Sequence, residues 1–109
     1  MDAGTRGVRV WLPNCASHHD YSDAEVYGTL CPITEGRVNI FRISEVASFF
    51  KDKLADAAEG DWVLVSGYPV LNSIAIYYFL KKYGHCNILQ WGALKREYVK
   101  LQLFDPFDA

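Results

Sequence analysis

The sequence predicts one small α/β domain, a Rossmann-like sandwich whose mostly parallel central sheet carries two main helices and an antiparallel hairpin at its C-terminal edge. Three observations favour this fold. Strand patterns alternate with two helical patterns, which is the order typical of βαβ units. A continuous apolar run at residues 61–65 lies between turn signals, as a central parallel strand does. The last two strand patterns are separated only by a turn near Gly92, which indicates a hairpin.

The first strand is expected over residues 7–12, and a polar loop over residues 14–23 follows it. We expect this loop to lead into a short helical turn at residues 23–27. Residues 30–34 are either a second short strand or an extended crossing. Pro32 limits them to an edge or irregular position, because proline has no N–H for a central sheet ladder.

The first helix is expected to begin at Ser44, a good N-cap residue, and to end at Gly60. The second helix is expected from about Asn72 to Tyr83, with its stop at Gly84. Its sequence has almost no polar face, and so much apolar surface needs cover on more than one side. We therefore expect a homodimer whose interface includes this helix, in addition to the contact of the helix with the sheet.

Two further strands, at residues 87–91 and 98–103, complete the predicted sheet. The whole chain, residues 1–109, is interpreted as a single domain with its core at about residues 7–103. The remaining residues, 104–109, form an acidic aromatic tail that we expect at the periphery.

Composition and charge argue against several classes of function. Half of the 109 residues are hydrophobic, which suffices for one core. The formal net charge of −2 argues against binding of duplex nucleic acid, because such binding depends on basic side chains that contact the phosphates. The three cysteines lack C-x-x-C spacing, so neither a disulfide framework nor a cysteine zinc site is expected. The most apolar run, residues 74–80, is too short to cross a bilayer, and we expect a cytoplasmic protein without membrane contact.

Two loops are expected to meet at the carboxyl edge of the sheet, where open α/β sheets place their ligand sites. One follows the first strand, and the other follows residues 61–65 and leads into a helix whose free N–H groups suit a phosphate. Glycine at such a turn also occurs for close packing alone. Neither a P-loop nor G-x-G-x-x-G is present, which disfavours ATP hydrolysis and dinucleotide redox chemistry. The predicted ligand-binding residues are Asn14, Tyr21, Ser22, Ser66, Gly67, Asn72 and Ser73.

The candidate catalytic residues are His18, His19 and Asp20, because histidine is a common acid or base near neutral pH and a carboxylate orients an imidazole. At most one of the two adjacent histidines is expected to face the crevice. The alternative is that both are exposed and that Asp20 caps a turn. Cys15 is either a nucleophile or, more commonly for its type, a small buried thiol. We expect no metal site, because the ligands would all come from one short loop, and no cofactor.

With these elements in place, the chain resembles small Rossmann-like proteins associated with CRISPR systems and phages, including CARF-type cyclic-oligonucleotide sensors and ring nucleases. The resemblance covers residues 7–103. The segments WLPN (11–14), HDYSDAE (19–25) and SGYPVLN (66–72) also look similar to small phage and bacterial proteins. CARF-like domains are typically dimers that hold a nucleotide at the two-fold axis, so the resemblance implies both. The loop after Val65 lacks a basic motif, and this departure counts against cleavage more than against binding.

The leading hypothesis is a dimeric domain that binds a nucleotide or cyclic-oligonucleotide-type phosphate ligand, in a phage-defence or counter-defence setting. The sequence does not decide between binding and phosphodiester cleavage. A phage-encoded protein of this kind is expected in the host cytoplasm. The alternative is a non-enzymatic protein-interaction module, such as a phage-encoded inhibitor or adaptor, with exposed aromatic anchors at Tyr21, Tyr27, Tyr68 and Phe107.

Overall fold

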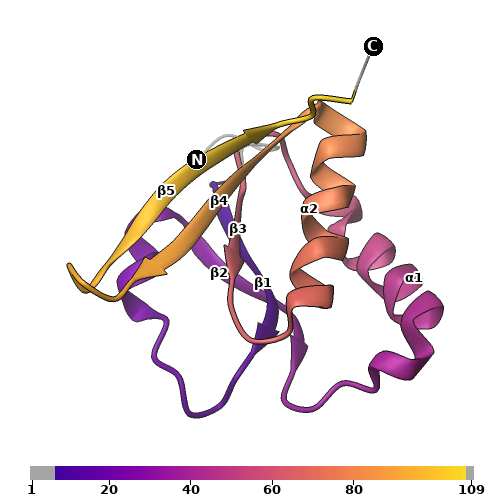
Figure 1. Ribbon diagram of the computed structural model, residues 1–109, viewed down its shortest axis with the longest axis horizontal. Helices are drawn as coiled ribbons and strands as arrows, with labels where there is room; N and C mark the ends of the chain where they lie inside the picture. The colour runs from indigo at the N-terminus through magenta and orange to yellow at the C-terminus, as the bar shows by residue number, and fades with distance from the viewer. Residues whose placement is uncertain (1–6, 108–109) are drawn as a thin grey trace.

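Five strands form a single sheet in the computed structural model, which describes residues 7–107 (Figure 1). Their order in space is β2-β1-β3-β4-β5, and every neighbouring pair is parallel except β4 and β5. The predicted α/β class, with a parallel centre and an antiparallel C-terminal pair, is confirmed. The strands are β1 (Arg9–Cys15), β2 (Thr29–Glu35), β3 (Trp62–Val65), β4 (His85–Gly92) and β5 (Glu97–Phe104).

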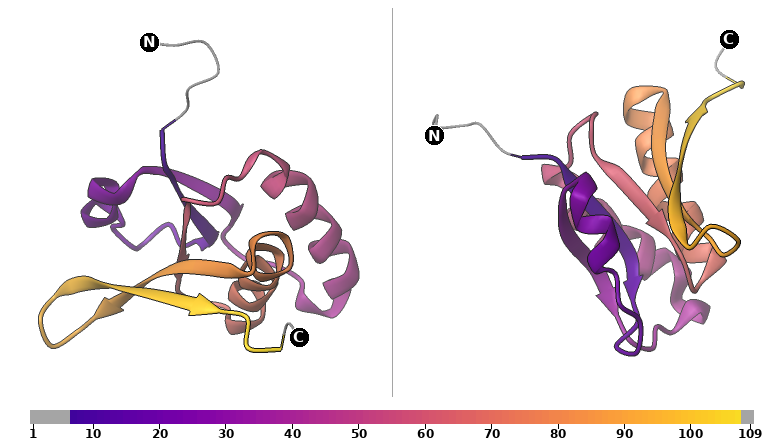
Figure 2. Two further views of the ribbon diagram at one scale, coloured as in Figure 1. Left: turned by 90° about the horizontal axis from the view of Figure 1, so that it is seen from above. Right: turned by 90° about the vertical axis from the view of Figure 1, so that its left-hand side faces the viewer.

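Helical segments cover the two faces of this sheet unequally. The connection from β1 to β2 runs toward one edge of the sheet. The connections from β2 to β3 and from β3 to β4 run toward the other edge. Right-handed crossovers therefore place them on opposite faces, with α1 and α2 on one face and η1 on the other (Figures 1 and 2). The segments are η1 (Ser22–Tyr27), η2 (Ile40–Arg42), α1 (Ile43–Lys53), η3 (Leu54–Asp56) and α2 (Pro69–Tyr83), the η segments being 3₁₀ turns.

Side-chain alternation along β1 divides the core into two apolar clusters. Trp11 belongs to the cluster beneath the helices, together with Phe50 of α1. Val10 and Leu12 belong to the cluster on the other face, together with Ala24 of η1. Both faces of the central strands are thus buried, which explains why the β3 sequence is a continuous apolar run.

Parallel pairing of β1 with β2 extends the first strand beyond its predicted end. The sequence predicts residues 7–12, but β1 continues to Cys15, because its last two residues pair with β2. Residues 30–34 lie within β2, an edge strand, where Pro32 is tolerated. The polar segment that the sequence places in a loop therefore begins inside a strand, and Asn14 is buried.

Both helices begin earlier than the sequence predicts. α1 begins at Ile43, so Ser44 lies inside the helix and is not its N-cap. α1 also ends earlier, at Lys53, where the tighter η3 turn takes over. α2 begins at Pro69 rather than Asn72, because proline at a first helical position forgoes an N–H that has no helical partner there. Neither helix of the described chain has the length and apolar composition that crossing a membrane requires.

The C-terminal hairpin is longer than predicted. Its ladder pairs His85 with Phe104, so Phe104 belongs to β5 rather than to the tail expected at residues 104–109. Residues 108–109 of that tail lie outside the described residues.

A buried carboxylate ties β1 to the turn before β3. Asp61 is 1% exposed, and its Oδ1 accepts a hydrogen bond from the Arg9 N–H at 3.1 Å. Its Oδ2 accepts from Trp11 Nε1–H at 2.9 Å and from the Ala58 N–H at 3.0 Å. Because these donors come from two segments far apart in the sequence, Asp61 fixes how β1 sits against the turn that leads into β3.

Candidate ligand-binding site

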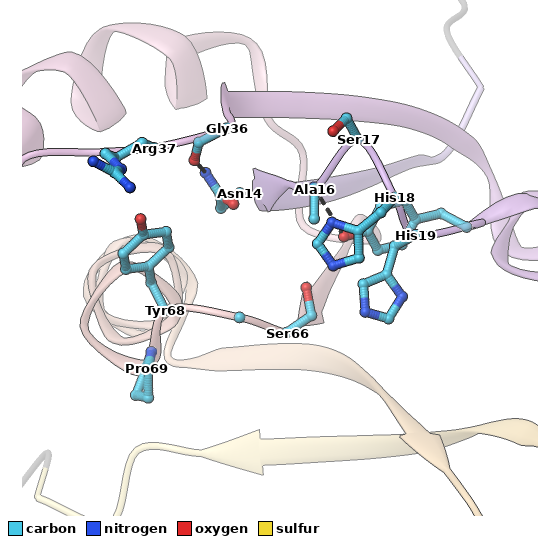
Figure 3. A pocket seen from close by; sticks show the side chains of 12 residues that line it. Asn14, Ala16, Ser17, His18, His19, Gly36, Arg37, Ser66, Tyr68 and Pro69 are labelled. Carbon is cyan, nitrogen blue, oxygen red and sulfur yellow. Dashed lines mark hydrogen bonds between the residues drawn. The ribbon is translucent and has the colours of Figure 1, made fainter.

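A pocket of about 560 Å³ opens at the carboxyl ends of β1 and β3, where the strand order reverses (Figure 3). The chain leaves these two strands on opposite faces of the sheet, which opens a crevice between their ends. Ligands of doubly wound sheets with the order 2-1-3-4-5 bind at this switch point. The twelve lining residues are Asn14, Ala16, Ser17, His18, His19 and Tyr21 near the end of β1, Gly36 and Arg37 after β2, and Ser66, Gly67, Tyr68 and Pro69 after β3.

Asn14 forms part of the framework of the pocket. It is 5% exposed, and its Nδ2 donates to Thr34 Oγ1 at 2.9 Å and to the Gly36 carbonyl at 2.8 Å. Thr34 Oγ1 in turn donates to the Pro13 carbonyl at 2.7 Å. Both amide hydrogens of Asn14 are therefore engaged in joining the end of β1 to the loop after β2.

Tyr21 holds the loop that follows β1. It is 8% exposed, and its hydroxyl accepts a hydrogen bond from the Ala16 N–H at 3.1 Å. A turn closed by the His19 N–H and the Ala16 carbonyl, at 3.1 Å, brings the rings of His18 and His19 together with centroids 5.2 Å apart. Both histidines line the pocket, so the expectation that at most one of them faces it is wrong.

Asp20 is bonded locally rather than to a histidine ring. Its Oδ1 accepts a hydrogen bond from the Ser22 N–H at 2.9 Å, and this bond lowers the pKa of the Asp20 carboxyl. The bond closes a turn that leads into η1, which is the capping role that the sequence left open. Neither Asp20 nor Ser22 lines the main pocket, although Asp20 lines a smaller neighbouring pocket together with His19 and Tyr21.

The turn between β3 and α2 forms the opposite wall. Ser66 and Gly67 line the pocket, and the Ser66 N–H donates to Asn72 Oδ1 at 3.3 Å. Ser73 Oγ donates to the Pro69 carbonyl at 3.0 Å, and neither Asn72 nor Ser73 lines the pocket. Gly67 has a φ of +61°, which favours glycine, and no atom lies within 4 Å of the place where a Cβ would stand.

The hydroxyl oxygen of Ser66 is buried and has no hydrogen-bond partner among the described residues. Leaving such a group unpaired costs about 1–3 kcal/mol, and exceptions of this kind often mark an absent water or ligand. Ser66 lines both the main pocket and the smaller one beside it. In Figure 3 its oxygen points toward the loop after β1. This hydroxyl is therefore available to a ligand that enters the pocket.

The lining carries basic side chains, and none of the twelve residues is acidic. Arg37 and Tyr68 lie on one side of the pocket, and His18 and His19 lie on the other (Figure 3). The Tyr68 hydroxyl accepts a weak hydrogen bond from the Val38 N–H at 3.4 Å. Tyr68 also occupies the N-cap position of α2, so the positive end of that helix faces the same space.

The sequence pattern alone does not assign Arg37 and Tyr68 to the site. A usable signal exists for Arg37, because it follows β2 almost directly, and β2 ends at the same sheet edge as β1. Tyr68 lies in the turn that the sequence singles out, but the sequence predicts an exposed aromatic anchor there and not a part of the pocket wall.

Cys15 does not line the pocket but packs against the apolar cluster around β1. Burial and the nearby Glu35 carboxylate raise the pKa of the Cys15 thiol, which disfavours the thiolate that a nucleophile requires. This environment favours the interpretation of Cys15 as a packed thiol. Within residues 7–107, no cluster of three or more histidine, cysteine or acidic side chains has the arrangement to hold a metal ion.

Comparison with known families gives one finding. A family model described as phage Pam3 gp32-like protein matches residues 9–104, which run from the start of β1 to the end of β5. Neither the curated proteins nor the solved structures gave a significant match. The family match supports the resemblance to a small phage protein. The resemblance to CARF-type sensors and ring nucleases has no support from these comparisons.

Proposed function

The chain belongs to the phage Pam3 gp32-like family, and we propose that it binds a phosphate-bearing small ligand of the nucleotide class in the pocket between β1 and β3. The observation that carries the proposal is the lining, in which one guanidinium, two imidazoles and a helix N-terminus surround a space without acidic residues. In a chain with a net charge of −2, this local excess of donors supports an anionic ligand.

The lining offers suitable partners for each part of such a ligand. Arg37 carries a planar guanidinium, whose paired N–H groups match a phosphate. The buried hydroxyl of Ser66 would add a further donor. The main chain at the start of α2 contributes less, because Pro69 has no N–H and the N–H groups of Leu71 and Asn72 already donate to the Tyr68 carbonyl. The ring of Tyr68 provides a flat surface against which a base would stack. A volume of about 560 Å³ lies within the range of small-molecule sites, which is about 300–1,000 Å³.

Cleavage of the bound ligand is a second step of the proposal. In phosphodiester hydrolysis, one imidazole would take a proton from the attacking water, and the other would give a proton to the leaving oxygen. His18 and His19 are the candidates, because both line the pocket. We assign no orienting role to Asp20, whose carboxylate is bonded to Ser22. In this proposal the protein acts in the host cytoplasm, in phage defence or counter-defence.

Thermal-shift measurements against inorganic phosphate and a panel of mono-, di- and cyclic oligonucleotides test the binding step. A ligand at 100 times its Kd stabilises the native state by about 2.7 kcal/mol, which raises the Tm of a domain of this size by roughly 10 °C. Arg37→Gln should reduce the shift, whereas Arg42→Gln should preserve it. Arg42 is the matched control, because it is also exposed but pairs with Glu45 at 3.2 Å outside the pocket.

Two results would contradict the binding proposal. One is a wild-type protein whose Tm does not respond to any ligand of the panel. The other is a shift that both arginine variants reduce equally, because that would indicate general charge attraction rather than this pocket.

The alternative, a protein-interaction module, is supported by only some of the aromatic side chains that the sequence suggests. The prediction that Tyr21 is an exposed anchor is wrong, because Tyr21 is only 8% exposed. Tyr27 packs inside the subunit, with its ring centroid 5.8 Å from that of Trp62. Phe107 is indeed exposed, at 91%, and so is Phe41, at 95%. If no ligand shifts the Tm, interaction through such exposed apolar side chains becomes the leading hypothesis.

A further inference from the structure

The strand β5 forms one edge of the sheet, and within residues 7–107 its ladder partner is β4 alone. Seven of its eight residues are exposed. Figure 2 shows the β4–β5 hairpin reaching past the other strands, with β5 on the outside. The outer side of β5 therefore presents main-chain N–H and C=O groups to which another strand can pair.

One face of β5 carries an apolar stripe, which consists of Val99, Leu101 and Leu103 at 44%, 44% and 41% exposure. The ladder places Leu101 opposite Ile88 and Leu103 opposite Cys86. Ile88 and Cys86 both belong to the core cluster beneath the helices. The stripe thus continues the core on the helix-covered face of the sheet, but it lies where the helices leave it exposed.

The two edges of the sheet differ in how they resist association. β2, at the other edge, contains Pro32, which lacks an N–H and so interrupts the row of free donors. β5 contains no proline, and its sequence is EYVKLQLF. A long edge strand with an apolar row and without such an interruption is a site where another strand adds.

We propose that a second copy of this chain covers β5, its own β5 pairing antiparallel about a two-fold axis through Leu101. The axis stands perpendicular to the sheet, so both apolar stripes lie on the same face of one continuous sheet. In this register, Leu101 faces the partner's Leu101, and Val99 faces the partner's Leu103. Val99 and Leu103 of each copy therefore meet apolar side chains, as in favourable cross-strand pairs.

The polar face of β5 is self-complementary in the same register. Lys100 faces the partner's Gln102, and Tyr98 faces the partner's Phe104, which makes an aromatic pair. Moving the two-fold axis to residue 100 would place Lys100 opposite the partner's Lys100, and like charges in that position are destabilising. Moving it to residue 102 would place Lys100 opposite the partner's Phe104, which removes the aromatic pair. This self-complementarity is the reason for assigning a second copy, rather than an unrelated strand, as the occupant.

The proposed interface differs from the one that the sequence predicts. The sequence predicts a dimer contact on α2. Leu71, Ala75 and Phe79 of that helix are buried in their own subunit, whereas Tyr77 is 63% exposed, so a contact on α2 stays a separate prediction. The pocket lies at the ends of β1 and β3, and β4 separates β3 from β5, so each copy would keep its own pocket. A test of the dimer therefore does not depend on whether the proposed ligand binds.

Sedimentation equilibrium with two matched variants tests the interface. Leu101→Lys should raise the dimer dissociation constant at least tenfold, because the axis places the two introduced lysines opposite each other. Val26→Lys makes the same change at a residue of η1 that is 81% exposed, and it should leave the dissociation constant unchanged. A wild type that stays monomeric at its highest soluble concentration overturns the proposal, as does a Leu101→Lys variant that dimerises like the wild type.

Disulfide trapping tests the register and remains informative if Leu101→Lys folds poorly. In a background with Cys15→Ser and Cys31→Ser, mild oxidation should link Leu101→Cys to itself, because opposite Cα atoms lie about 4.5–5.5 Å apart in an antiparallel pair. Val99→Cys should not link to itself, but it should link to Leu103→Cys when the two variants are mixed. Self-linkage of Val99→Cys as fast as that of Leu101→Cys overturns the assigned register.

Discussion

Replacing Asp61 by alanine should remove a large part of the stability of the domain. The carboxylate is 1% exposed and accepts hydrogen bonds from Arg9 N–H, Trp11 Nε1–H and Ala58 N–H. Each buried donor left without an acceptor costs about 1–3 kcal/mol, and the two main-chain donors are only partly buried. We therefore expect a loss of about 4 kcal/mol, against a total that is typically about 5–15 kcal/mol.

Urea unfolding followed by circular dichroism measures this loss, with Asp→Asn changes at two positions as the matched comparison. Asp61→Asn should cost about 2 kcal/mol, because its amide retains one acceptor oxygen but turns N–H groups toward donors. Asp56→Asn should cost less than about 1 kcal/mol, because Asp56 is 67% exposed and its 3.0 Å ion pair with Arg9 is on the surface. An Asp61→Ala variant that loses less than about 1 kcal/mol would refute the assignment of Asp61 as the tie between β1 and the turn before β3.

Three further predictions concern buried groups and glycines. Burial raises the pKa of Cys86 to about 12, so the unfolded state gives up its thiol proton first, and stability should fall as the pH rises from about 9 toward 12. Between pH 8 and pH 10 the urea midpoint should drop by the equivalent of roughly 1 kcal/mol more in the wild type than in Cys86→Ala. Gly28→Ala should cost at least about 2 kcal/mol by thermal unfolding, because its φ is +156° and a Cβ would lie 2.5 Å from a main-chain oxygen of the segment before β1. Gly67→Ala should cost only about 1 kcal/mol, since its φ is +61° but the space around a Cβ is open. Tyr21→Phe removes the hydroxyl that accepts from the Ala16 N–H, and it should cost about 1 kcal/mol of unfolding free energy.

Each of these predictions has a contrary result. Equal alkaline losses in the wild type and Cys86→Ala would assign the pH dependence to other groups. A Gly28→Ala variant as stable as Gly67→Ala would show that the chain before β1 moves aside at little cost. An unchanged Tyr21→Phe variant would mean that the loop after β1 is held by other contacts.

The sequence predicts the class of this fold because its signals are periodic and local. The apolar run of β3 and the glycine after α2 are visible without any tertiary contact. The end of β1 is not visible in this way, because Asn14 and Cys15 become part of a strand only by pairing with β2. Arg37 escapes assignment for the same reason, since its place beside the pocket follows from where β2 lies in the sheet.

The catalytic set predicted around Asp20 illustrates a different limit. Spacing in the sequence shows that a carboxylate is near two imidazoles, but it does not show which group the carboxylate bonds. Here the Ser22 N–H two residues away is its partner. Local competition of this kind is common for aspartate, whose short side chain reaches its own main chain. The pairing of His18 with His19 depends on the turn that the Ala16 carbonyl closes.

The double attachment of Tyr21 connects the dynamics of η1 to those of the pocket. Its ring belongs to the apolar cluster with Ala24 of η1, while its hydroxyl holds the main chain at Ala16. A single 3₁₀ segment has few bonds of its own, so η1 is expected to open more readily than the strands beneath it. Each opening would release the loop that carries His18 and His19. A molecule bound by that loop should therefore slow amide hydrogen exchange in η1, even at amides that it does not touch.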